Sequence, residues 1–391
     1  MTLSFVELII LLAAAQGLFL AVLIFHKHGN IFANRFLGTL ILFYSILLIH
    51  LLFGDLGYPE LYYRLAPLVV GIAFFMIPLH YLYARDLVTN ASGFNLRDSL
   101  HFIPFILWEV FWVFMLVLTE ESEPLWRIAI GSEESAVRFV LFNWLIIIQA
   151  VMYLLGTVYV LDRYAREIKD VFSNLDQIKL DWLRYMTYLA LALVGIFLME
   201  NALNLFGPTI SAKFELSSLL VAGYVYAIGY LGIFKSEVFS QPEVAATLNQ
   251  IPAIRDSRAP SEVRSSGDKY RKSGLSHEKA EEYRQRLEQL MDEKQPYTQS
   301  DLTLDNLADM LGISPHNLSE VINTRLNQNF FDYINGYRVE QVKADLTDPE
   351  KGNLTILAIA FDAGFNSKSS FYTIFKRETG MTPTDYQKQF S

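Results

Sequence analysis

The sequence predicts an all-α protein: a seven-transmembrane helical bundle followed by a cytoplasmic all-helical domain with two helix-turn-helix motifs. Hydrophobic residues make up 52% of the 391 residues and charged residues only 19%, against roughly 25% charged in soluble domains. Long apolar runs fill residues 1–234, and an internal helical repeat fills much of residues 275–391. The chain has no cysteine, which excludes a disulfide framework, a thiolate metal site and a cysteine nucleophile.

The N-terminal part contains apolar runs that are each near the roughly 20 residues that cross a bilayer as a helix. Seven such runs lie at 4–25, 36–53, 62–84, 99–118, 139–161, 185–206 and 216–234. The first run has no basic segment before it and no small-residue cleavage site, so we interpret it as a retained span rather than a signal peptide. We therefore expect a seven-span transmembrane sensor domain at residues 1–234.

The basic residues of the loops orient this predicted bundle. With the N-terminus outside, the inner loops hold nine Lys and Arg residues and the outer loops and edges hold four. The positive-inside rule then places the N-terminus outside and the C-terminal domain in the cytoplasm.

Some polar residues interrupt the predicted spans. An ionisable group in hydrocarbon is costly, so it is a functional-site hypothesis by default. Our candidates for signal sensing, all in the outer half of the bundle, are His50, Glu109, Glu200 and Asn201. In the alternative interpretation, these side chains only pair neighbouring helices through hydrogen bonds.

Residues 235–274 separate the membrane domain from the C-terminal domain at 275–391. They are rich in Ser, Pro, Arg and Glu, a composition typical of a flexible linker. Order is expected to resume at Ser276, a favoured N-cap residue, with an amphipathic helix from 277 to 293.

The C-terminal domain contains an internal repeat with an offset of 52 residues. The pattern Leu-x-x-Leu-Ala-x-x-Leu-Gly at 304–312 recurs as Ile-x-x-Ile-Ala-x-x-Ala-Gly at 356–364. In each copy a threonine caps an apolar stripe, a glycine follows it, and a serine then caps a second helix. The small alanine, the glycine turn and the apolar second helix together indicate a helix-turn-helix.

Between the two copies, residues 330–346 are expected to form one helix about 25 Å long at 1.5 Å per residue. A stiff spacer of that length could set two recognition helices roughly one DNA turn apart, near 34 Å. Both helices could then enter the major groove on one side of a duplex.

These residues resemble the DNA-binding domain of AraC-type (AraC/XylS family) transcription regulators. The match covers about 110 residues, including the first half from 304 to 338. The second half matches more sharply, with Ile359-Ala360-x-x-Ala363-Gly364-Phe365-x-Ser367-x-Ser369-x-Phe371-x-x-x-Phe375-Lys376-Arg377-x-x-Gly380-x-Thr382-Pro383-x-x-Tyr386. The whole chain looks like the subgroup in which a multi-span membrane domain replaces a soluble sensor.

The resemblance implies DNA contacts from both recognition helices. In the first helix it implies base or backbone contacts from His316, Asn317, Ser319 and Glu320. In the second helix it implies base contacts from Lys368, Ser369 and Thr373, and a phosphate contact from Lys376. Glu320 departs from the family pattern, in which many members carry a basic residue there. A carboxylate can only accept a hydrogen bond, for example from a cytosine amino group.

The charge of the C-terminal domain is unusual for a DNA-binding domain. Residues 275–391 carry a net charge of −6, whereas DNA-binding domains usually have a basic surface. We therefore expect weak non-specific affinity, for which a homodimer held at the membrane could compensate through effective concentration.

The resemblance implies a one-component transcription regulator in the bacterial cytoplasmic membrane, not an enzyme, with no cofactor. Its implied partners are promoter DNA, the lipid bilayer, an unknown small-molecule or lipid signal, a second copy of the chain and, for an activator, RNA polymerase.

Two other functions remain open. The first is a transporter or channel with a regulatory tail. The second is a membrane sensor kinase, because Ser276-His277-Glu278 opens a helix after the linker. No Asp-x-Gly-x-Gly nucleotide loop follows, however, and neither a Walker A motif nor His-Glu-x-x-His occurs, so catalysis has no motif support.

Overall fold

The computed structural model describes residues 4–28, 31–89, 94–118, 133–176, 178–204, 216–235 and 275–390. The chain forms two compact units. The first comprises Met1–Asp162 and Leu180–Pro242, and the second comprises Arg163–Lys179 and Glu243–Ser391. Regular structure in the described residues is helical, apart from one isolated bridge between Phe172 and Thr303. The predicted all-α class is confirmed. The predicted linker lies outside the described residues beyond Lys235.

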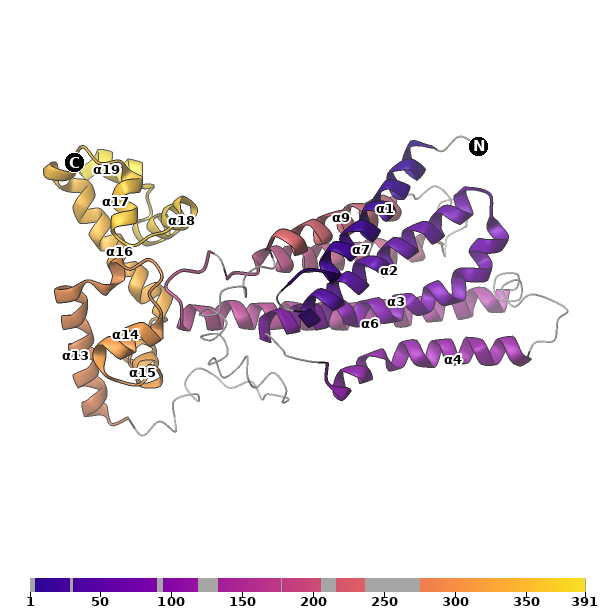
Figure 1. Cartoon of the computed structure of the whole chain (residues 1–391), viewed down its shortest axis with the longest axis horizontal. Helices are drawn as coiled ribbons and strands as arrows, with labels where there is room; N and C mark the ends of the chain where they lie inside the picture. Colours follow the sequence, from indigo (N-terminus) through magenta and orange to yellow (C-terminus); the bar gives the residue numbers. More distant parts are fainter. Residues whose placement is uncertain are drawn as a thin grey trace. The chain divides into compact units, whose positions relative to one another are not determined.

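The first unit is made of long apolar helices (Figure 1). α1 packs along α2 and α9, and α2 packs along α3. The helices that begin in this unit are α1 (Phe5–Phe25), α2 (Ile31–Asp55), α3 (Pro59–Thr89), η1 (Leu96–Phe102), α4 (Ile103–Leu118), α6 (Glu133–Glu167), α7 (Asp181–Asn204) and α9 (Leu216–Lys235).

Five helices of the described residues are long and apolar enough to cross a membrane, and they belong to α1, α2, α3, α6 and α7. The other two predicted spans correspond to α4, which has 16 described residues, and to α9, which has 20. Both are helices at the predicted places; α4 is shorter than a typical span, and α9 is close to its length. The count of seven therefore stays a prediction.

α1 has one buried side and one exposed side, and both are apolar. Ile10 and Ala14 are buried, while Leu12 and Phe19 are about three-fifths exposed although equally apolar. A helix that is apolar all round needs either burial or lipid around it. Gly17 faces Ser45 of α2 so closely that a Cβ there would collide with the serine hydroxyl. Such small residues allow close helix packing in membranes.

The second unit is a tightly packed set of shorter helices. Figure 1 shows α16 running between α13–α15 and α17–α19. The helices are η2 (Ile168–Asp170), α13 (His277–Lys294), η4 (Pro296–Thr298), α14 (Leu304–Leu311), α15 (Pro315–Arg325), α16 (Phe330–Thr347), η5 (Pro349–Lys351), α17 (Ile356–Asp362), α18 (Lys368–Thr379) and α19 (Pro383–Phe390).

Two apolar cores meet along α16. Phe330, Tyr333 and Ile334 of α16 belong to the first core, with residues of α13, α14 and α15. Val339 and Val342 belong to the second core, with residues of α17 and α18. The predicted spacer helix is therefore a shared structural element rather than a rod between two independent motifs.

The capping pattern predicted from the repeat is confirmed. Thr303 and Thr355 cap α14 and α17, and each hydroxyl accepts a hydrogen bond from the backbone three residues later. Ser314 and Ser367 cap α15 and α18 in the same way. The glycines also take the left-handed backbone that the turns require, with φ of 67° at Gly312 and 98° at Gly364.

Candidate nucleic-acid interface

α18 presents one buried face and one exposed polar face. Phe371, Ile374 and Phe375 are at most 4% exposed and anchor the helix in the second core. The exposed residues include all four for which the resemblance implies DNA contacts: Lys368, Ser369, Thr373 and Lys376. Ser369, Thr373 and Lys376 follow one another at intervals of four and three residues, which keeps these three on one side of the helix. The arrangement gives a row of donors on a helix whose orientation its core residues fix.

A depression of about 460 Å³ continues this exposed face towards α19. Its lining combines hydroxyl groups with two cationic side chains: Tyr372, Thr373, Lys376, Arg377 and Thr382. The Lys368 ammonium lies 5.7 Å from the centre of the Tyr372 ring, within the range of a cation–π contact. Cationic side chains therefore lie at both ends of the exposed face of α18.

The first predicted recognition helix, α15, exposes fewer of its candidate contact residues than α18. His316 is exposed and Asn317 is half-buried. Ser319 is only 8% exposed, and its hydroxyl and carbonyl both accept hydrogen bonds from the Asn323 side chain. A base contact from Ser319 would require this pairing to open.

Glu320 is the other unusual position of α15. It is half-buried, and its buried Oε2 has no hydrogen-bond partner among the residues that the structure describes. A buried, unpaired carboxylate oxygen costs free energy, and a carboxylate would repel a phosphate brought to this helix. The contacts of α15 with DNA stay a prediction, as do those of α18, whose exposed face carries more hydrogen-bond donors.

A buried arginine connects α16 to the first half of the domain and to the segment between α6 and α7. Arg338 of α16 is 1% exposed and donates to the carbonyls of Tyr297 and Gln299, each at 2.7 Å. It also donates to the carbonyl of Ser173 at 3.2 Å and to its hydroxyl at 3.1 Å. Burial lowers the pKa of Arg338 to about 10, so the guanidinium stays charged at neutral pH.

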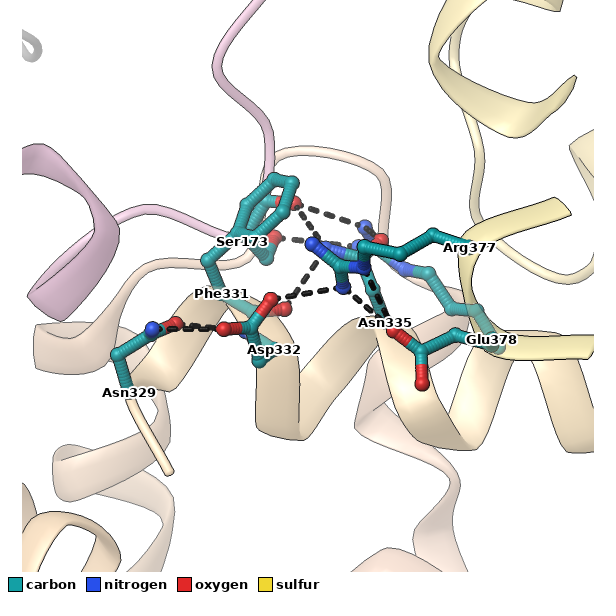
Figure 2. A network of polar contacts seen from close by, with 8 residues as sticks. Ser173, Asn329, Phe331, Asp332, Asn335, Arg377 and Glu378 are labelled. Atoms are coloured by element: carbon teal, nitrogen blue, oxygen red, sulfur yellow. Dashed lines mark hydrogen bonds and ion pairs between the residues drawn. The ribbon is translucent and has the colours of Figure 1, made fainter. Parts of the chain in front are cut away.

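Ser173 lies in the segment between α6 and α7, far from α16 in sequence. Figure 2 shows its polar atoms facing Asn335, whose side chain donates to the carbonyls of Ser173 and Phe331 at 3.0 and 2.8 Å. Sequence reasoning missed Ser173 and Asn335 and gave Arg338 no structural role. The only local signal was a polar pair, Asn335 and Arg338, one turn apart on the spacer helix.

The candidate sensing residues of the first unit lie in two places. His50 of α2 is buried and stacks on Tyr62 of α3 at 4.5 Å between ring centres. Glu109 of α4 packs beside Gly71 of α3, where a Cβ would collide with its carboxylate. Tyr62 and Gly71 are about 14 Å apart along α3, so His50 and Glu109 do not form one site. The side chains of Glu200 and Asn201 lie outside the described part of the structure.

The C-terminal residues are similar to those of known proteins. Residues 307–389 match the family described as "Helix-turn-helix domain". An uncharacterised HTH-type transcriptional regulator of Staphylococcus aureus (strain COL) is 33% identical over 102 residues, which are 26% of this chain and 13% of that protein. The melibiose operon regulatory protein of Escherichia coli (strain K12) is 32% identical over 87 residues, which are 22% of this chain and 28% of that protein.

A solved structure of a Listeria innocua protein of unknown function is 25% identical, with a TM-score of 0.24. The alignment covers 28% of this chain and 96% of that one. All of these matches cover about a quarter of the chain or less. The family match and the two similar regulators support the AraC-type resemblance of its C-terminal part. Residues 307–389 form a helix-turn-helix domain.

Proposed function

We propose that the chain is a membrane-bound one-component transcription regulator that binds promoter DNA through an AraC-type double helix-turn-helix domain. The observation that carries the proposal is the exposed row of Lys368, Ser369, Thr373 and Lys376 on a helix fixed by its buried face. Lys368, Ser369 and Thr373 reach base edges, and Lys376 pairs with a phosphate. The names of the similar regulators support the same activity.

In this proposal the first unit is a seven-span bundle with its N-terminus outside the cytoplasmic membrane and the C-terminal domain in the cytoplasm. The five long apolar helices and the exposed apolar side chains of α1 support membrane insertion. The bundle receives a small-molecule or lipid signal, for which His50, Glu109, Glu200 and Asn201 are the candidate residues. A second copy and, for activation, RNA polymerase complete the set of partners.

Genome-wide DNA occupancy of the intact protein tests the proposal. The control is the intact chain with Lys368→Ala and Lys376→Ala together, which keeps the membrane part and removes two DNA-facing cations. We expect discrete occupied promoters for the native chain and their loss in the double variant. Equal occupancy patterns for the two proteins would remove α18 from DNA recognition.

A further inference from the structure

The segment between α6 and α7 belongs structurally to the helix-turn-helix unit, although it is separated from it by about 100 residues of sequence. We define residues 171–179 as the α6–α7 loop. Tyr164, near the end of α6, closes the base of this loop by donating its hydroxyl to the carbonyl of Ile178 at 2.8 Å. This hydrogen bond connects the two ends of the loop, whose described residues are 171–176, 178 and 179.

The loop pairs first with the chain that leads into α14. The amide of Leu304 donates to the carbonyl of Val171 at 2.9 Å, and the amide of Ser173 donates to the carbonyl of Leu302 at 3.3 Å. The Ser173 hydroxyl donates to the same Leu302 carbonyl at 2.7 Å. Val171 also packs against the first core. This strip of backbone pairing ties the loop to the N-terminal half of the domain.

The loop then reaches the second half. Leu175 packs against the second core, and the Asp176 carboxylate accepts a hydrogen bond from the hydroxyl of Ser367. Ser367 is the N-cap of α18 and directly precedes Lys368 and Ser369. One short loop thus contacts both cores, the spacer helix through Ser173, and the leading end of the second recognition helix.

From these contacts we propose that the α6–α7 loop is an intramolecular antagonist of DNA binding, and that its docked state is the off state of the regulator. The inference deepens the proposed function and rests on it. Docking fixes the relative placement of the two halves, which must match successive grooves of the duplex. It also puts the negative charge of Asp176 at the N-cap that precedes Lys368 and Ser369. The Asp176 partner Lys179, at 3.2 Å, is half-exposed, so the carboxylate still opposes DNA phosphates that approach this end of α18.

In this proposal the signal reaches the loop through its covalent connection to α6 and α7. The loop continues directly into α7 at one end and follows α6 and η2 at the other, so a rearrangement of these helices moves the ends of the loop. A signal received by the bundle therefore changes the docked fraction, and the helix-turn-helix unit becomes free to adjust to DNA.

A cross-link between the loop and α18 tests the proposal directly, because the native chain has no cysteine. The full-length variant carrying Asp176→Cys and Ser367→Cys is purified in lipid nanodiscs and treated with a short, reducible dithiol cross-linker. Its affinity is measured on a duplex selected by the full-length native chain from a random-sequence pool. The two single-cysteine variants, treated identically, control for loss of the N-cap and for modification.

We expect efficient cross-linking and a fall in DNA affinity of at least about 10-fold, as for a locked two-state equilibrium, restored by reduction. Asp176→Asn, without cross-linker, should bind about 5-fold more tightly at low salt, because it removes one charge close to phosphate. Asp181→Asn is the matched control, since Asp181 pairs with Arg184 within the first unit. Its affinity should equal that of the native chain.

Three results would overturn the inference. Failure to cross-link would show that Asp176 and Ser367 are not neighbours in the membrane-bound protein. Unchanged binding after cross-linking would show that docking of the loop has no effect on DNA binding. Tighter binding after cross-linking, or weaker binding by Asp176→Asn, would show that the docked loop supports DNA binding. If the native chain selected no duplex at all, the proposed function would fail, while the cross-linking yield would still report on docking.

Discussion

Arg377 of α18 forms an ion pair with Asp332 in the first turn of α16, with 2.8 Å between a guanidinium nitrogen and a carboxylate oxygen. Figure 2 shows the pair together with Glu378, which lies 2.6 Å from the same guanidinium nitrogen. Partial burial alone lowers the pKa of Arg377, but the hydrogen bonds and charges of Glu378 and Asp332 outweigh it, so the pKa is raised. The pair ties the second recognition helix to the start of the spacer helix.

The first prediction concerns this pair. Asp332→Asn keeps the size of the side chain and removes its charge, and we expect α18 to lose less than about 1 kcal/mol of local stability. The expected effect is small because both side chains are about a third or more exposed, and water and salt screen exposed pairs. Hydrogen exchange of the α18 amides in the full-length chain measures it.

Glu340→Gln provides the control, since Glu340 pairs with Lys343 within α16 and its side chain is 70% exposed. Exchange of α18 should not respond to it. A loss of more than about 2 kcal/mol in Asp332→Asn would mean that the pair is effectively buried.

The second prediction separates base recognition from phosphate contact. Lys368→Ala should change sequence preference, because a groove-facing donor can discriminate bases by about 1–3 kcal/mol. Lys376→Ala should weaken binding to all sequences and lower the salt slope by about one. Binding of the full-length variants to a panel of duplexes at several salt concentrations measures both effects.

Lys294→Ala controls for loss of a cation, because Lys294 is exposed at the end of α13 and precedes the residues that match the helix-turn-helix family. Its binding should equal that of the native chain. If Lys368→Ala and Lys376→Ala also left binding unchanged, α18 would not be the recognition helix.

The third prediction concerns the buried guanidinium. Arg338→Met removes the donor to the Tyr297 carbonyl and leaves the Gln299 carbonyl with only the 3.4 Å hydrogen bond from the Leu302 amide. An unsatisfied buried group costs about 1–3 kcal/mol, so α16 should be destabilised by at least about 1 kcal/mol. Hydrogen exchange along α16 measures the loss. Arg325→Met, an exposed position in the last turn of α15, should stay within about 0.5 kcal/mol of the native chain.

The pH dependence of Arg338 gives a further check within this prediction. Its folded pKa of about 10 is below the ordinary 12.5, so the unfolded state binds more protons only between these two values. Stability should therefore rise with pH in that window because of Arg338. Between about pH 5 and pH 9 the group is charged in both states, and the difference between Arg338→Met and the native chain should be constant. A difference that changed with pH in this range would assign the effect to another group.

The fourth prediction concerns topology. A reporter active only in the cytoplasm, fused after Ser391, should function, and a reporter active only in the periplasm should stay silent. The physical reason is the excess of basic residues in the predicted inner loops. The opposite result would remove the C-terminal domain from the compartment that holds DNA.

The sequence predicted those parts of the second unit that local rules determine. Thr303, Ser314, Thr355 and Ser367 cap the helices because a side-chain oxygen followed by an apolar stripe is a local signal. The burial of Ser319 could not be predicted, because it depends on the packing of α15 and on Asn323.

The docking of the α6–α7 loop was beyond such rules as well. Ser173 and Asp176 are part of no repeat or motif, and their partners Arg338 and Ser367 are more than 160 residues away. Contacts at that separation follow from tertiary packing. The same holds for the first unit, where hydropathy located the helices but not their packing, such as that of α1 along α2 and α9.

The position of α16 within two cores also determines how the domain unfolds. Loss of the second core would expose Val339 and Val342, and fraying of α16 would then reach Ile334 and Tyr333 of the first core. Two helix-turn-helices joined by an inert rod would melt one after the other. Here the free energy of each half depends on the other through a common helix, so both should unfold in a single cooperative transition. A destabilising substitution under α18 should consequently accelerate the hydrogen exchange of α14, although the two helices belong to different cores.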